Sequence, residues 1–145
     1  MRARRKKVVI RPARPDDLRA VYRLARASEL SAPSHPAAEK YWIKDFLLDG
    51  QPFLVATDDG GKVVGFTLGE CATGDVAIRH LTAVDPEHRR QGIGEQLVKA
   101  FEREARRRKM TCILMYVSGG AHWARTHRRL GYAAGAIVRE YQKFL

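Results

Sequence analysis

The feature that most constrains this sequence is a change of pattern near its middle, from a strand-like run to a long helix-like run. Residues 76–84 are rich in β-branched and apolar side chains and predict a strand. Residues 91–109 repeat apolar side chains every four positions and predict an amphipathic helix. A polar turn that begins at Asp85 joins them, and Gly92 and Gly94 stand at the helix start. The chain therefore brings a strand end, a tight turn and a helix amino terminus to one point.

This turn has the properties of an anion-binding site. The first turn of a helix leaves four N–H groups without helical partners, and the helix dipole places partial positive charge there. Gly92 and Gly94 let a ligand approach the backbone, and Arg89 and Arg90 add positive charge. A phosphate group is the natural ligand of such a turn. The alternative is a helix cap with incidental glycines, since the chain has no Walker motif and no complete G-x-G-x-x-G motif.

The rest of the sequence predicts further strands and helices, which gives the order β-α-α-β-β-β-α-β-α-β for the whole chain. The other expected strands are residues 8–10, 52–57, 62–70, 112–117 and 137–144. One further helix is expected to start within residues 14–17, and two others are expected to cover residues 37–48 and 121–130. Strand runs combined with a β-α-β crossover indicate an α/β or α+β fold with a mixed sheet. Because no repeat or linker divides the chain, we expect one domain over residues 1–145, with residues 1–7 as a basic extension.

Composition narrows the function classes. The hydrophobic fraction of 45% predicts a folded core, and no apolar run is long enough to span a membrane. Because no apolar signal core follows Met1–Lys7, we expect a cytoplasmic protein. The net charge of +11 favours anionic partners, but aromatic residues do not interleave with the basic clusters, which argues against a nucleic-acid-binding module. Cys71 and Cys112 lack metal-ligand spacing, so we interpret both as buried apolar residues and predict no metal site.

The turn also resembles a known signature. Arg89-x-x-Gly92-x-Gly94 is similar to the R/Q-x-x-G-x-G/A motif of the GNAT acetyltransferase superfamily. Residues 81–86 resemble the strand that leads into that motif, and residues 130–132 (Leu-Gly-Tyr) match its carboxy-terminal region. The resemblance implies a three-layer α/β/α fold with a mixed, mostly antiparallel central sheet flanked by helices. It also implies acetyl-CoA as co-substrate.

The resemblance places the cofactor contacts along the strand and the turn. It implies that backbone amides of residues 90–95 hold the CoA pyrophosphate and that the strand edge at Ala83 and Val84 pairs with the pantetheine arm. The Val84 amide would then face the thioester carbonyl. The implied cofactor-binding residues are Thr82, Ala83, Val84, Arg89, Arg90, Gln91, Gly92, Ile93, Gly94 and Glu95.

The sequence departs from the family pattern near its end. The family commonly has a Tyr that acts as the general acid at the position of His127 in this chain. It also commonly has an Asn at about the position of Gly120. His127 could replace that Tyr as the acid that protonates the departing thiolate, or it could be a surface histidine. Tyr116 is a second candidate acid, with a packed core aromatic as its alternative.

The attacking amine also needs a base. His80 is one candidate, because some arylalkylamine-type relatives carry a proton-shuttling histidine at a matching place, and alternation puts His80, Thr82 and Val84 on one face. Glu70 is the other candidate, and a solvent-facing strand end is its alternative interpretation. Tyr41 and Trp42 lie in the region where the family usually builds its acceptor wall. We expect core packing for both, with substrate contact as the alternative for Trp42.

These observations support an enzyme that moves an acetyl group from acetyl-CoA to a primary amine by direct attack in a ternary complex. The acceptor could be a protein N-terminal amine, as in ribosomal-protein acetylation, or a lysine amine. A small-molecule amine is one alternative, and a non-catalytic acyl-CoA-binding protein is an alternative of another class. We expect a monomer or homodimer, with nucleic acid binding at most incidentally through the basic surface.

Overall fold

A computed structural model describes residues 7–28, 36–116, 121–136, 141 and 143, which fall into two units, residues 1–115 and 116–145. The first unit holds the strands β1 (Val9–Pro12), β2 (Phe53–Thr57), β3 (Val63–Ala72), β4 (Val76–Val84) and β5 (Cys112–Met115). Its helices are α1 (Leu18–Ala27), α2 (Pro36–Leu48) and α3 (Ile93–Arg107), with 3-10 turns at Pro15–Asp17 and Pro86–His88. The second unit holds α4 (Ala121–Arg129).

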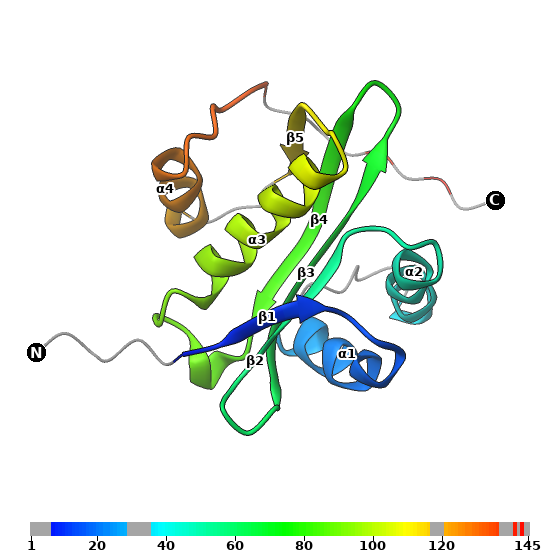
Figure 1. Cartoon of the computed structure of the whole chain (residues 1–145), viewed down its shortest axis with the longest axis vertical. Helices are drawn as coiled ribbons and strands as arrows, with labels where there is room; N and C mark the ends of the chain where they lie inside the picture. The colour runs from blue at the N-terminus through cyan, green and yellow to red at the C-terminus, as the bar shows by residue number, and fades with distance from the viewer. Residues whose placement is uncertain (1–6, 29–35, 117–120, 137–140, 142, 144–145) are drawn as a thin grey trace, which may run out of the picture. The chain divides into compact units, whose positions relative to one another are not determined.

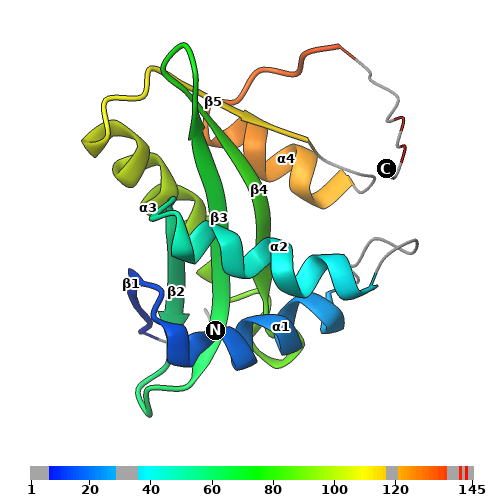
Figure 2. The same cartoon turned by 90° about the vertical axis from the view of Figure 1, so that its right-hand side faces the viewer.

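Among the described residues, the five strands form one sheet in the order β1-β2-β3-β4-β5. Strands β1 to β4 pair antiparallel with one another, whereas β5 runs parallel to β4 because α3 makes the crossover between them. Helix α3 lies on one face of the sheet, and α1 and α2 lie on the other (Figures 1 and 2). The expected three-layer α/β/α fold with a mixed, mostly antiparallel sheet is confirmed.

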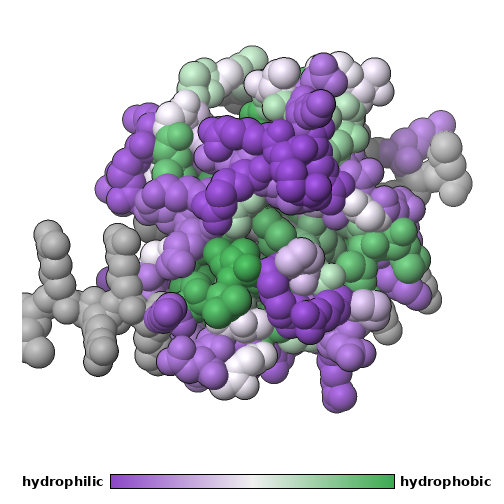
Figure 3. Space-filling model, viewed as in Figure 1, coloured by the Kyte–Doolittle hydropathy of each residue, from purple (hydrophilic) through white to green (hydrophobic). Residues whose placement is uncertain are grey.

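The periodicity of α3 predicts its packing correctly. Ile93, Leu97, Phe101 and Ala105 are all buried, and they pack against residues of β2, β3, β4 and β5. The opposite side of this helix is hydrophilic over its carboxy-terminal half, as Figure 3 shows, and its exposed residues there include Lys99, Arg103, Arg106 and Arg107. Burial of one apolar stripe against the sheet is what holds the amino terminus of α3 beside the end of β4.

A second core lies between the sheet and the other two helices. Val21 and Leu24 of α1 and Ile43 and Phe46 of α2 pack against buried side chains of β3, including Phe66. The start of α1 is further held by an ion pair in which Arg11 of β1 donates to both carboxylate oxygens of Asp17, at 2.7 and 2.9 Å. This hydrogen bond from Arg11 lowers the pKa of Asp17.

The pairing of β3 with β4 contains a β-bulge at His80. Leu68 lies opposite Leu81 and Gly69 lies opposite Arg79, so that His80 is an extra residue in β4. Gly69 is required at this place, because a Cβ there would lie 2.1 Å from the Ile78 carbonyl oxygen and 2.7 Å from the Phe101 ring. The bulge breaks the alternation of side chains along β4.

The predicted shared face of His80, Thr82 and Val84 is therefore wrong. His80 packs against rings of α2, and the next residue, Leu81, packs into the same core cluster. Val84 instead packs with Ile93 under α3, on the opposite face of the sheet. The side chains of His80 and Leu81 can point to the same face because the bulge interrupts the regular alternation of β4 at His80.

Further expectations concern β5 and the two cysteines. The strand ends at Met115 rather than at residue 117, and it is only half covered, since Ile113 packs under α3 whereas Leu114 is exposed. Cys112 is exposed and Cys71 is half-buried, so the interpretation of both as buried residues is wrong.

The predicted strand at residues 137–144 falls mostly outside the described residues. None of the described helices is long and apolar enough to cross a membrane.

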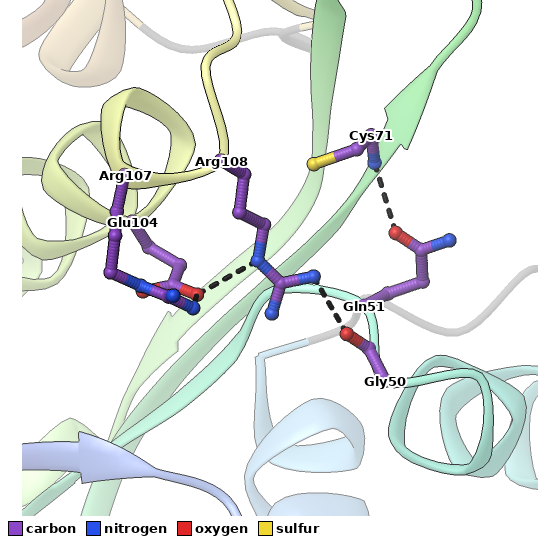
Figure 4. A network of polar contacts seen from close by, with 6 residues as sticks. All are labelled: Gly50, Gln51, Cys71, Glu104, Arg107 and Arg108. Carbon is purple, nitrogen blue, oxygen red and sulfur yellow. Dashed lines mark hydrogen bonds and ion pairs between the residues drawn. The ribbon is translucent and has the colours of Figure 1, made fainter.

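A polar network anchors the carboxy-terminal end of α3 (Figure 4). Glu104 accepts hydrogen bonds from Arg107 and from Arg108, at 2.5 and 2.8 Å, and Arg108 also donates to the Gly50 carbonyl at 2.7 Å. The next residue of that loop, Gln51, accepts a hydrogen bond at its Oε1 from the Cys71 amide at 3.0 Å. The network joins α3 to the loop between α2 and β2, far along the helix from the glycine turn.

Candidate active site

The turn between β4 and α3 has a backbone suited to anions. Asp85 opens it, because its carboxylate accepts a hydrogen bond from the Glu87 amide at 3.0 Å. Arg90 and Gly92 both have a positive φ, 61° and 78°. Left-handed residues within such a turn direct successive N–H groups into a concave nest that binds anions. The conformation at Gly92 explains why a glycine stands there.

The helix end adds further donors to this turn. The first hydrogen bond into α3 runs from the Gln96 amide to the Gly92 carbonyl at 3.1 Å. The N–H groups of residues 93–95 precede that bond, so they point out of the helix end with its partial positive charge. The predicted pyrophosphate site at residues 90–95 thus has the backbone that a phosphate ligand requires.

The side chains of the turn have different roles. Arg89 donates from Nε to the Val84 carbonyl at 3.3 Å and from Nη2 to the Ser28 hydroxyl at 3.4 Å. It therefore ties the turn to β4 and to the end of α1, although both it and Arg90 are exposed. The buried Oε1 of Gln91 has no hydrogen-bond partner among the described residues.

The edge of β4 is open beside this turn. Strand β5 pairs only with residues 76–79, and within the described chain no strand pairs with the same edge of residues 80–84. The Asp85 amide donates to the Val64 carbonyl of β3 at 2.8 Å. Because alternate residues of an antiparallel strand direct their polar groups to the same side, the N–H groups of Thr82 and Val84 point to the open edge. Those of Ala83 point to β3.

A pair of threonines supports this edge. The Thr67 hydroxyl lies 2.8 Å from the Thr82 hydroxyl and donates to the Leu81 carbonyl at 3.0 Å. Thr67 is fully buried, so both contacts are shielded from water. No sequence pattern pointed to Thr67, because the pairing of β3 with β4 alone brings it under the edge.

His80 and Glu70 come together on the α2 side of the sheet. The distance from His80 Nε2 to Glu70 Oε2 is 3.5 Å. The His80 ring also packs against the rings of Trp42 and Phe46, at centroid distances of 5.3 and 5.4 Å. Trp42 packs edge-on against Phe46 and remains 39% exposed. His80, Glu70 and Trp42 are thus neighbours. Phe46 joins them because it lies one helical turn after Trp42 on α2.

The two candidate acids belong to the second unit. His127 is only 6% exposed and packs edge-on against Tyr132, whose amide donates to the His127 carbonyl at 2.9 Å. The alternative interpretation of His127 as a surface histidine is therefore wrong. Tyr116 is 69% exposed, so its alternative interpretation as a packed core aromatic is also wrong. The acid roles of both residues stay predictions, and the side chain of Tyr41 lies outside the described part.

The α/β/α architecture places the nest at the head of α3 beside the open edge of β4, an arrangement suited to a phosphate-bearing ligand. Residues 49–134 match the family model of the acetyltransferase (GNAT) domain. The chain belongs to the GNAT acetyltransferase family and is an acetyl-CoA-dependent N-acetyltransferase, with acetyl-CoA as its co-substrate.

Three similar proteins illustrate the range of this family. The chain is 30% identical to an L-methionine sulfoximine/L-methionine sulfone acetyltransferase of Pseudomonas aeruginosa, over 77% of this chain and 69% of that protein. It is 28% identical to Ard1 from Thermoplasma volcanium, with a TM-score of 0.77 over 89% of this chain and 84% of that one. The fold also matches yncA from Salmonella typhimurium, solved with its cofactor acetyl-CoA, at 22% identity and a TM-score of 0.74, over 90% of this chain and 82% of that one.

Proposed function

We propose that this enzyme transfers the acetyl group to a primary amine by direct attack in a ternary complex, with His80 as the general base. The observation that carries the proposal is the place of His80, which stands at the bulge of β4, 3.5 Å from the Glu70 carboxylate and at one end of the open edge. Histidine is a competent proton acceptor near neutral pH. His80 thus supplies the base that a protonated amine needs before it attacks.

The turn and the open edge are proposed to hold acetyl-CoA. The N–H groups of residues 90–95 would bind the pyrophosphate, and the Val84 amide would bind the pantetheine arm. Thr82 is two residues from His80, roughly 7 Å along a strand, whereas Val84 is four residues away, roughly 13 Å. The Thr82 amide is therefore better placed than the Val84 amide to stabilise the oxyanion that forms when an amine next to His80 attacks the thioester.

The proton and bond changes can be assigned to these groups. The ammonium of the acceptor gives one proton to the His80 imidazole, and the Glu70 carboxylate stabilises the resulting imidazolium. The amine nitrogen then forms a C–N bond with the thioester carbon, and it gives its second proton to water as the C–S bond breaks. The departing thiolate takes up a proton, for which His127 and Tyr116 remain the proposed donors.

The acceptor is proposed to be a protein or peptide amine, either an N-terminal amine or a lysine side chain. A small-molecule amine is the second candidate, and the similarity to an acetyltransferase of L-methionine sulfoximine and L-methionine sulfone favours it. A non-catalytic acyl-CoA-binding role would leave His80 and Glu70 without a task.

The experiment is release of free thiol from acetyl-CoA on addition of peptides, lysine and small amines. We expect thiol release with at least one amine, and a His80→Asn variant with kcat lowered by about 10²-fold or more and with unchanged CoA affinity. A variant that keeps the original kcat would exclude His80 as the base. Binding of CoA without thiol release for any amine would refute the catalytic proposal as a whole.

A further inference from the structure

We infer that the acceptor of this enzyme is a cationic primary amine with no carboxylate on the neighbouring carbon, because Trp42 and Glu70 attract the ammonium and Glu70 repels a carboxylate. The inference rests on the proposed function, because it takes His80 as the place where the amine loses its proton. It names a substrate class within that function: peptide N termini, amino acid amides, lysine side chains and simple amines are included, whereas free α-amino acids are disfavoured.

The first observation is the charge around His80. The His80 ring packs against the rings of Trp42 and Phe46 and faces the Glu70 carboxylate. The nearest arginine in β4, Arg79, is buried and donates to the Met115 sulfur at 2.8 Å, and Met115 is its partner in β5. An acceptor at His80 therefore meets a negative charge, which attracts an ammonium and repels a carboxylate.

The second observation is the indole of Trp42. Its ring is 39% exposed and stands at 73° to the His80 ring, with a centroid distance of 5.3 Å. An aromatic face attracts a cation, and the attraction is largest for Trp. An ammonium beside His80 would thus be bound by the indole face and by the Glu70 carboxylate. Both interactions favour the protonated amine, which then passes its proton to His80.

The size of the discrimination follows from distance. The carboxylate of an α-amino acid lies about 3–4 Å from its own nitrogen, so it would lie roughly 6 Å from Glu70 when the nitrogen is at His80. At that distance and at an effective dielectric between those of water and a protein surface, the repulsion corresponds to about tenfold in kcat/KM. The protein's net charge of +11 does not offset it, because exposed charges farther than about 8 Å are screened by salt.

The test compares matched pairs that differ only at the carboxyl group: methionine with methioninamide, alanine with alaninamide, and glycine with glycinamide. Thiol release is measured over a full pH profile, because an amide lowers the pKa of the neighbouring amine, and the pH-independent value of kcat/KM fitted to each profile is compared. We expect each amide to react about tenfold faster or more. In Glu70→Gln the ratio should fall toward one, whereas Trp42→Leu should raise KM for amides and leave the ratio unchanged.

The outcomes separate this inference from the proposal beneath it. Equal or faster reaction of the free amino acids, or a ratio that Glu70→Gln does not change, overturns the substrate class and leaves the transferase proposal intact. If no amide, amino acid, lysine or peptide releases thiol while CoA still binds, the transferase proposal fails, and this inference fails with it.

Discussion

The substitution Gly69→Ala tests the bulge that places His80. A Cβ at residue 69 would lie 2.1 Å from the Ile78 carbonyl oxygen and 2.7 and 2.8 Å from two carbons of the Phe101 ring. The first distance is more than 1 Å shorter than an ordinary contact, and the oxygen belongs to the backbone of the paired strand. Overpacking of a core costs about 1–3 kcal/mol, and we expect the upper end here because the carbonyl can move only if the pairing changes.

This cost can be measured by equilibrium urea denaturation and by thermal unfolding. A loss of about 3 kcal/mol corresponds to a fall in Tm of roughly 6–12 °C for a chain of this size. Gly60→Ala is the matched control, since Gly60 lies in the exposed β2–β3 turn, where a Cβ would meet only Asp58 Oδ1, at 3.4 Å. We expect the control to be as stable as the original protein or slightly more stable, because alanine restricts the unfolded chain.

A second readout links the bulge to the chemistry. If Gly69→Ala displaces β4 by about 1 Å at His80, kcat should fall by about 10²-fold while CoA affinity changes little. Adding Phe101→Leu removes the clash with the ring but not the clash with the Ile78 carbonyl. The double variant should therefore stay at least about 1 kcal/mol less stable than Phe101→Leu alone. A Gly69→Ala protein as stable and as active as the Gly60→Ala control would refute the reasoning.

Two other predictions concern the turn and the end of α3. Gly92→Val should abolish CoA binding in a folded protein. Gly61→Val is the control and should not affect CoA binding, although Gly61 in the β2–β3 turn has nearly the same φ, 79° against 78°. Isothermal titration with CoA measures both affinities, and equal values would show that the turn is not part of the cofactor site. The hydrogen bond from Arg107, with another from Arg108, lowers the pKa of Glu104 to about 2. Its contribution, about 1 kcal/mol, is present above the unfolded-state pKa near 4.5 and is lost as pH falls through 2, so Glu104→Gln should lower Tm at pH 7 but not at pH 2. A Tm difference that persists at pH 2 would contradict this cause.

Sequence reasoning succeeded where one local period decides the outcome. The four-residue spacing of Ile93, Leu97 and Phe101 predicts their burial, because an apolar stripe on a helix can be satisfied only by packing against another element. The run at residues 76–84 was predicted with the bounds that β4 has in the structure. The turn between them was recognisable since its glycines and arginines are adjacent in the chain.

Sequence reasoning failed where neighbours distant in the chain decide. The apolar run at residues 112–117 predicts a buried strand, but α3 covers only one face of β5, so Cys112 and Leu114 are exposed. Tyr116 was weighed as a core residue on the same argument and is exposed for the same kind of reason: an aromatic side chain is buried only where another element covers it. Which face is covered depends on the packing of other elements, and no local pattern encodes it.

The failure of alternation at His80 is the most informative of these differences. Strict alternation would have turned His80 to the α3 side, away from Glu70, Trp42 and the α2 surface. The bulge turns it to the side where a carboxylate and an exposed indole stand, while Thr82, two residues on, keeps its amide directed to the open edge. One extra residue in β4, made possible by the missing side chain of Gly69, thus brings the proposed base and the proposed oxyanion donor to the same stretch of strand. The local irregularity that defeats prediction from the sequence is the feature that gives the candidate site its geometry.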